Sequence, residues 1–334
     1  MSGEEHMSMT RRPQRSRFAA ATALTAASVL VLAACGSGDD SSSDSGNAAA
    51  EAKKVSVTDA TGKKVEVPAA PKKVIALSEM DLDSSLALGV KPVGLTAGRG
   101  QKGAPEYLAD KAKGIPVVGA VTGPDIEKVV QAKPDVILAG QLADQQVLKQ
   151  LQEVAPTVVT IDRKKDWKKA LTLTGQVLGK SGEAKTFLAD YDTKVAEVKK
   201  SLGDNAGADV SVARYSAKGT AVMQQGVFIS DVLKDMGFKR PGIQNKPGQG
   251  HSTPLSDEDL KQIDADWLFI GTLASTGKDA SLFKELKSKP AYKQLSAVKD
   301  GHTTEIDGSK WTSLGGALAS VSVLDDIEKA MGDK

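Results

Sequence analysis

One long helical segment divides this sequence into two halves. From Ser181 to Leu202, glycine and proline are absent after Gly182, and apolar side chains recur at the spacing of an amphipathic helix. These apolar residues are Phe187, Leu188, Tyr191, Val195, Val198 and Leu202. At about 1.5 Å per residue the helix is about 30 Å long. We therefore expect a single helix to stand between two separately patterned parts of the chain.

On both sides of this helix, short apolar runs alternate with helical patterns, which is typical of parallel βαβ layers. The expected strands are Val74–Leu77, Pro92–Thr96, Pro116–Val118, Val136–Ala139 and Val158–Ile161, then Val210–Tyr215, Ala221–Gln224, Trp267–Ile270 and Thr303–Ile306. Further helices are expected at Leu82–Leu88, which ends at Gly89, at Ile126–Ala132, which ends before Pro134, and at Ser313–Met331. The pattern predicts an α/β fold of two Rossmann-like lobes joined by one long helix.

The N-terminus has the features of an export signal. Four arginines between Arg11 and Arg17 precede an apolar run, Phe18–Ala34, that is short for a membrane span. The run ends at Leu32-Ala33-Ala34-Cys35-Gly36, which resembles the lipobox of bacterial lipoproteins. In that motif the cysteine is acylated and becomes the new N-terminus. The alternatives are an ordinary secretory signal and a short membrane helix, but Cys35 is the only cysteine.

A tether should follow a lipid anchor, and residues 36–52 have its composition. They are mostly Gly, Ser, Asp, Asn and Ala, which bury little surface and stay flexible. We therefore expect a signal peptide (1–34), a tether (35–52), a first α/β lobe (53–180), a bridging helix (181–203) and a second α/β lobe (204–334). Acyl chains on Cys35 would hold the protein on the outer face of the cell membrane.

Charge and residue usage argue against several classes of function. Without residues 1–34 the chain loses four of its 44 basic and two of its 42 acidic residues, which leaves 40 of each. This balance argues against a nucleic-acid partner. Only His251 and His302 remain as histidines, too few to predict direct capture of a metal ion. An exported hydrolase is the less favoured alternative, because the sequence lacks G-x-S-x-G, H-E-x-x-H and a cysteine nucleophile.

Residues Gly98, Gly100 and Gly103 match the G-x-G-x-x-G pattern of dinucleotide sites. That pattern requires a following long helix and an acidic residue at the end of the next strand. Here Pro105 interrupts the segment and Gly119 follows the next strand. We therefore do not predict a dinucleotide site.

Several segments together are similar to one family. They are Pro71–Ser78, Leu86–Gly94, Asp125–Val129, Lys133–Ala139, Leu151–Val158, Leu255–Leu260, Ile263–Ile270, Trp311–Gly316 and Leu324–Glu328. In order and spacing they resemble the ABC-transporter binding proteins for ferric siderophores and cobalamin, over nearly all of residues 53–330. The resemblance implies the class III periplasmic binding protein fold, in which the ligand binds between two lobes that close only slightly.

The resemblance also implies ligand-binding residues. Arg99, in the loop after the second strand, and Arg214, in a strand of the second lobe, match positions where the family places ligand-contacting arginines. Further candidates are Tyr215, Trp311 at the last strand–helix junction, and His251 in a glycine-rich loop. An arginine can donate to the oxygens around Fe(III), and a tryptophan can cover an apolar rim. The alternatives are ion pairs for the arginines, core packing for Trp311 and a solvated position for His251.

The expected ligand is a chelated Fe(III) complex, and no cofactor is expected. Zero charge in the mature chain favours a near-neutral ferric hydroxamate siderophore, and cobalamin or haem is the alternative. The resemblance implies that Glu127 and Glu258, at two helix starts, pair with arginines of an ABC permease that works with its ATPase. The alternative for both is stabilisation of the first helical turn. We expect the protein to act as a monomer.

Overall fold

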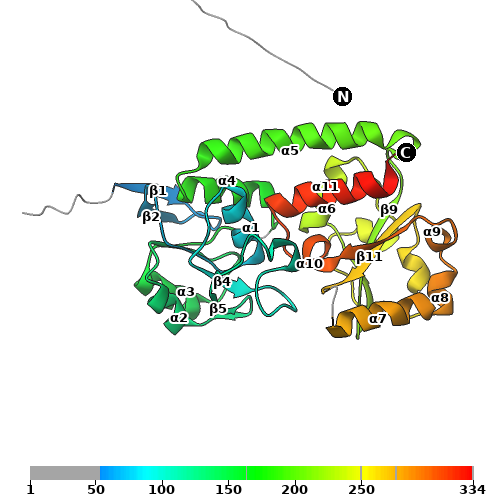
Figure 1. Cartoon of the computed structure of the whole chain (residues 1–334), viewed down its shortest axis with the longest axis horizontal. Coiled ribbons are helices and arrows are strands. Elements are labelled where there is room, and N and C mark those ends of the chain that lie inside the picture. Colours follow the sequence, from blue (N-terminus) through cyan, green and yellow to red (C-terminus); the bar gives the residue numbers. More distant parts are fainter. Residues whose placement is uncertain (1–52, 163, 249, 275–276, 333–334) are drawn as a thin grey trace, which may run out of the picture. The chain divides into compact units, whose positions relative to one another are not determined.

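The computed structural model describes residues 53–162, 164–248, 250–274 and 277–332 (Figure 1). The expected signal peptide, Cys35 and the tether lie outside these residues. Within the described part of the chain, no helix is long and apolar enough to cross a membrane.

The first half of the chain builds a six-stranded sheet in the order β6-β5-β4-β3-β7-β8. The strands run parallel, except that β6 is antiparallel to its neighbour β5. Their bounds are β3 (Val74–Ala76), β4 (Gly94–Ala97), β5 (Val117–Ala120), β6 (Gly123–Pro124), β7 (Val136–Leu138) and β8 (Thr157–Val158). Every residue of the central strands β3, β4 and β7 is buried, as expected for a parallel sheet covered on both faces. A hairpin of β1 (Lys54–Thr58) and β2 (Lys64–Pro68) precedes the sheet.

The helices of this half follow the strands and begin at the carboxyl edge of the sheet. They are α1 (Glu79–Ala87), α2 (Ile126–Ala132), α3 (Gln145–Val154) and α4 (Trp167–Val177), with a 3₁₀ helix at Glu106–Leu108. The Ser78 hydroxyl accepts the N–H of Asp81, and this cap starts α1 two residues after β3 ends. The first turn of α1 therefore places acidic side chains at the sheet edge where ligands bind in α/β folds.

The second half builds a four-stranded sheet in the order β10-β9-β11-β12. In it β9, β11 and β12 are parallel, and β10 is antiparallel to β9. The strands are β9 (Val210–Ser216), β10 (Gly219–Val222), β11 (Trp267–Thr272) and β12 (Thr303–Asp307). The helices are α6 (Phe228–Asp235), α7 (Gly277–Ser288), α8 (Pro290–Lys293), α9 (Ser296–Lys299) and α10 (Gly308–Trp311), with 3₁₀ helices at Gly203–Asn205, Gly242–Asn245 and Leu260–Ile263.

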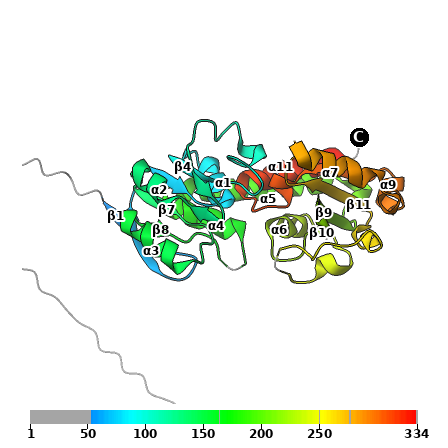
Figure 2. The same cartoon turned by 90° about the horizontal axis from the view of Figure 1, so that it is seen from below.

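Two helices connect the halves. Helix α5 (Ser181–Ser201) runs alongside both sheets, and α11 (Ala317–Met331) lies against it (Figures 1 and 2). Helix α11 also packs on α1 and α4 of the first half, so it shares the connecting role expected of α5 alone. Trp167 of α4, Tyr191 of α5 and Phe228 of α6 belong to one apolar cluster, and the Trp167 and Tyr191 rings meet edge to face at 4.9 Å. This shared core favours a rigid connection between the halves.

Three expected helices differ from the structure. The first, expected at Leu82–Leu88, begins three residues earlier, at Glu79, because Ser78 caps it. The last helix begins at Ala317 instead of Ser313, because Gly315-Gly316 interrupts the helical pattern and the cap residue Gly316 has a non-helical backbone, with φ −155° and ψ −149°. The helix expected to open at Glu258 is only a 3₁₀ turn, Leu260–Ile263, since few residues separate it from β11. The Ser256 hydroxyl accepts the Asp259 N–H at 3.3 Å and so caps this short turn.

Candidate ligand-binding cleft

A cavity of about 280 Å³ lies between the two halves. The first half contributes Arg99, from the loop after β4, and Lys165, from the loop before α4. The second half contributes Arg214 and Met223, together with segments 227–229, 250–251 and 311–314. The cavity is therefore lined by cations from both halves and by apolar side chains, mainly from the second half.

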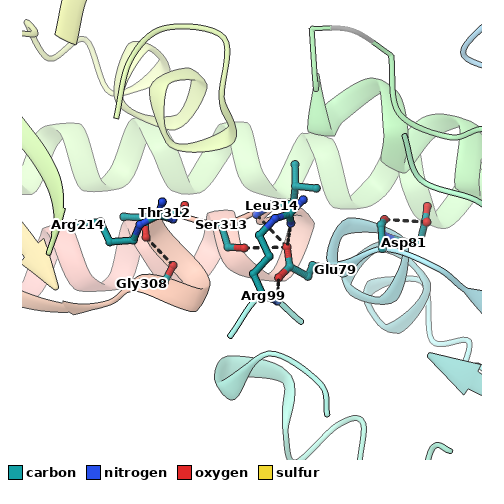
Figure 3. A network of polar contacts seen from close by, with 9 residues as sticks. Glu79, Asp81, Arg99, Arg214, Gly308, Thr312, Ser313 and Leu314 are labelled. Carbon is teal, nitrogen blue, oxygen red and sulfur yellow. Dashed lines mark hydrogen bonds and ion pairs between the residues drawn. The ribbon is translucent and has the colours of Figure 1, made fainter. Parts of the chain in front are cut away.

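The first arginine of the cavity, Arg99, is held by Glu79 of α1. The Glu79 carboxylate accepts the backbone N–H of Arg99 at 2.6 Å and forms an ion pair with its guanidinium. It also accepts from the Ser313 hydroxyl at 2.8 Å and the Leu314 N–H at 3.3 Å (Figure 3). Only 2% of the Glu79 side chain is exposed, against 41% for Arg99. One buried carboxylate thus orients a cleft arginine and ties the first half of the chain to the second.

Arg214 lies on β9 and is half-buried. Its Nη1 donates to the backbone oxygen of Thr312 at 3.1 Å, next to the segment that Glu79 holds (Figure 3). Among the residues described, no carboxylate forms an ion pair with it, so the alternative of an ion pair does not occur there. Burial lowers the pKa of Arg214, and the nearby positive charge of Arg99 lowers it further, while Glu79 opposes both.

Lys165 was not predicted as a site residue. Its backbone has a φ of 54°, a left-handed conformation uncommon for a lysine. The Asp162 carboxylate, which accepts the N–H groups of Lys164 at 2.9 Å and Asp166 at 3.4 Å, organises this turn. Burial lowers the pKa of Lys165, and the Arg99 charge adds to the effect. The sequence could have indicated Lys165, because it is a basic residue that follows the last expected strand of the first half. Residues in that position lie at the carboxyl edge of a parallel sheet, where ligands bind.

The apolar wall includes Phe228 and Trp311. Trp311 is fully buried: its Nε1 donates to Asp326 at 2.8 Å and its ring stacks on Phe269 at 4.7 Å. The side chain therefore contributes to the core as well as lining the cavity. His251 also lines the cavity and is exposed, with its Nδ1 2.9 Å from the Ser252 oxygen.

Tyr215 does not line the cavity. It follows Arg214 on β9, and neighbouring residues of a strand point to opposite faces of the sheet. Its ring lies in a separate apolar cluster, and its hydroxyl donates to Glu285 at 3.3 Å. The structure therefore places Tyr215 behind the sheet, away from the other candidates.

The two expected docking carboxylates lie away from the cavity lining. Glu127 is in the first turn of α2 and Glu258 precedes the 3₁₀ turn at Leu260–Ile263, and both are exposed. Glu258 also borders a separate surface groove of about 500 Å³ with Lys261 and Lys289.

The glycine-rich segment 98–103 forms a turn closed by the Gly98 N–H, which donates to the Gly103 oxygen at 2.8 Å. The 3₁₀ helix at Glu106–Leu108 follows it, rather than the long helix of a dinucleotide site. In the described ranges, no group of three or more His, Cys, Asp or Glu side chains is arranged to hold a metal ion.

Two α/β halves, connected by packed helices and enclosing a cavity between them, define a two-lobed solute-binding protein. The chain belongs to the periplasmic binding protein family, whose model matches residues 74–309. This membership confirms the predicted family, fold and non-enzymatic binding role.

The family relationship extends to named proteins and solved structures. The chain is 34% identical over 309 residues to a Bacillus subtilis protein named "Probable siderophore-binding lipoprotein YfiY", covering 90% of this chain and 94% of that protein. Staphylococcus aureus SirA, solved with staphyloferrin B, aligns with a TM-score of 0.72 and 31% identity, over 83% of this chain and 98% of SirA. Bacillus subtilis FeuA, solved with ferri-bacillibactin, aligns with a TM-score of 0.71 and 25% identity, over 84% of this chain and 98% of FeuA.

Proposed function

We propose that the protein binds a ferric siderophore in the cleft between its lobes and delivers it to an ABC importer. The observation that carries this proposal is the convergence of Arg99, Lys165 and Arg214 on one cavity with an apolar wall. A ferric chelate presents oxygens to such cations and organic arms to such a wall. The names of the relatives support a siderophore over cobalamin or haem.

The arrangement of the cleft suits capture without large movement. Arg99 is already oriented by Glu79, and Arg214 is already fixed by the Thr312 oxygen. Because these guanidinium groups are ordered before the ligand arrives, less conformational entropy is lost on binding. The shared apolar core around α5 holds the two sides of the cavity at a fixed separation.

A titration tests the proposed ligand class. Trp311 lines the cavity, and the Trp167 ring lies 6.5 Å from that of Phe228, another lining residue. Intrinsic fluorescence should therefore change as ligand binds. The purified protein should show saturable binding of at least one ferric siderophore and weaker binding of haem and cobalamin. Saturable binding of haem or cobalamin with no response to any ferric siderophore would contradict the proposal.

The proposal includes a lipid anchor at Cys35 on the outer face of the cell membrane. Its support is the lipobox-like sequence at residues 32–36 and the name of the relative that is 34% identical, a lipoprotein. Mass spectrometry of the protein from native membranes should find an acylated Cys35 at the N-terminus. An unmodified cysteine, or a retained 1–34 segment, would contradict this part.

The proposed partner is the importer's permease, which would contact Glu127 on the first lobe and Glu258 on the second. Both carboxylates are exposed, and both lie outside the cavity lining, so a partner could contact them while the cleft holds a ligand. Two contacts on separate lobes would let the permease sense both sides of the cleft.

A further inference from the structure

The cations of the cleft exceed the carboxylates that neutralise them. Arg99 has Glu79 as its partner. Lys165 and Arg214 line the same cavity, and neither has an ion-pair partner within the described part of the chain. Among the described residues, two partly buried positive charges thus line one cavity without an ion-pair partner.

Lys165 also approaches the opposite lobe. A side-chain carbon added at Gly250, in the second half, would lie 3.9 Å from the Lys165 Nζ. The ammonium group therefore extends across the cavity towards the loop that carries His251. The turn at Asp162 holds the neighbouring backbone, Lys165 occupies the left-handed region, and no carboxylate among the described residues pairs with its ammonium group.

Placing like charges together in a partly desolvated cavity is unfavourable unless an opposite charge is supplied. Burial lowers the pKa values of Lys165 and Arg214, and the positive charge of Arg99 lowers both further, while Glu79 raises that of Arg214. A bound anion would relieve this repulsion, whereas a neutral ligand would leave it in place.

We infer that the cleft selects ferric chelates with net negative charge over near-neutral ones, and that Lys165 is a ligand-contacting residue that sets this selection together with Arg214. The inference rests on the proposed siderophore function and narrows its ligand class. It replaces the near-neutral hydroxamate expected from the overall charge, because the charge that acts on the ligand is that of the cavity.

Three chelates separate the possibilities. Ferric citrate is an anionic carboxylate chelate, ferri-bacillibactin is an anionic catecholate chelate, and ferrichrome is a neutral hydroxamate chelate. Dissociation constants would be measured by fluorescence at low and high salt for the wild type and two variants. Lys165→Met keeps most of the apolar stem and removes the charge. Lys164→Met is the matched control, because Lys164 is the adjacent lysine, is exposed and does not line the cavity.

The wild type should bind at least one anionic chelate roughly tenfold or more tighter than ferrichrome, and added salt should weaken that binding. Lys165→Met should lose roughly tenfold to a hundredfold in affinity for the anionic chelate, and its affinity for ferrichrome should not fall. Lys164→Met should match the wild type. Which anionic chelate responds identifies the donor type.

The failures are distinguishable. If ferrichrome binds as tightly as the anionic chelates, charge selection is wrong while the siderophore function stands. If Lys165→Met changes no affinity, or lowers all three alike, the role assigned to Lys165 is wrong. If no ferric chelate binds to the folded protein, the proposed function itself fails.

Discussion

Removing the Glu79 carboxylate should destabilise the protein strongly, although the residue belongs to no hydrophobic core. In Glu79→Ala four donors lose one acceptor: the Arg99 N–H, the Arg99 guanidinium, the Ser313 hydroxyl and the Leu314 N–H. The Arg99 side chain is 41% exposed, so water can replace much of its ion pair. Most of the cost comes from the backbone donors that lose their acceptor in a buried site. We expect a loss of about 3–5 kcal/mol in the free energy of unfolding.

Urea denaturation measures this loss directly, and Glu79→Gln serves as a milder second variant if the alanine variant does not fold. Gln keeps one acceptor oxygen, so its loss in the free energy of unfolding should be about half of that in Glu79→Ala. Glu127→Gln is the matched control, since it removes an exposed carboxylate in the first turn of another helix and should cost no more than about 1 kcal/mol. A double-mutant cycle with Ser313→Ala should give a coupling of about 1 kcal/mol or more. Equal stabilities for the Glu79 and Glu127 variants, or no coupling to Ser313, would refute the inter-lobe role of Glu79.

Three further predictions follow from the structure. Arg214→Met should weaken siderophore binding by roughly tenfold to a hundredfold with little change in melting temperature; the reverse result in calorimetry and fluorescence titration would make Arg214 a structural residue. Burial raises the pKa values of Asp81 and Asp83 to about 6, above their unfolded values, so the folded chain binds additional protons as pH falls. The free energy of unfolding should therefore rise from about pH 7 towards pH 5, with a smaller slope in Asp83→Asn; a stability that is flat or falls over this range would contradict the assignment. Changing Glu127 and Glu258 together to Lys should leave ligand affinity intact and reduce ligand uptake by cells; normal uptake would reject the docking role.

The sequence predicted the regular elements well where the signal is local. The start of the bridging helix at Ser181 and both ends of the helix Ile126–Ala132 were placed correctly, because apolar periodicity and a following Pro or Gly determine them. The hairpin at Lys54–Pro68 was missed, although it has strand-like alternation. The expected helix start at Ser313 was wrong because Gly315 and Gly316 stand inside the expected span. The contacts of Ser313 and Leu314 with the distant Glu79 carboxylate were not predicted, because no local pattern records them.

The site residues likewise differ in whether neighbouring sequence alone could place them. The placement of Tyr215 behind the sheet was available from sequence, since it and Arg214 are consecutive in a predicted strand and must point to opposite faces. Arg99, Arg214 and Trp311 were matched to cavity positions through the family resemblance, and His251 was a candidate from its glycine-rich loop; all four line the cavity. Of these four, Arg214 is the residue whose role the Arg214→Met titration tests.

The positive charge of the cavity lining could not be predicted from the net charge of the chain, because the net charge does not record which charged residues the fold brings together. Without residues 1–34 the chain has 40 basic and 40 acidic residues, and salt and water screen surface charges within about 10 Å. The cavity instead brings together Arg99 and Lys165, from two loops of the first half, and Arg214, from strand β9 of the second half. Of the acidic residues that face them, Glu79 is already committed to Arg99 and to the opposite lobe. The ligand is therefore expected to respond to the two cations that remain, and a chain of zero net charge can select an anion.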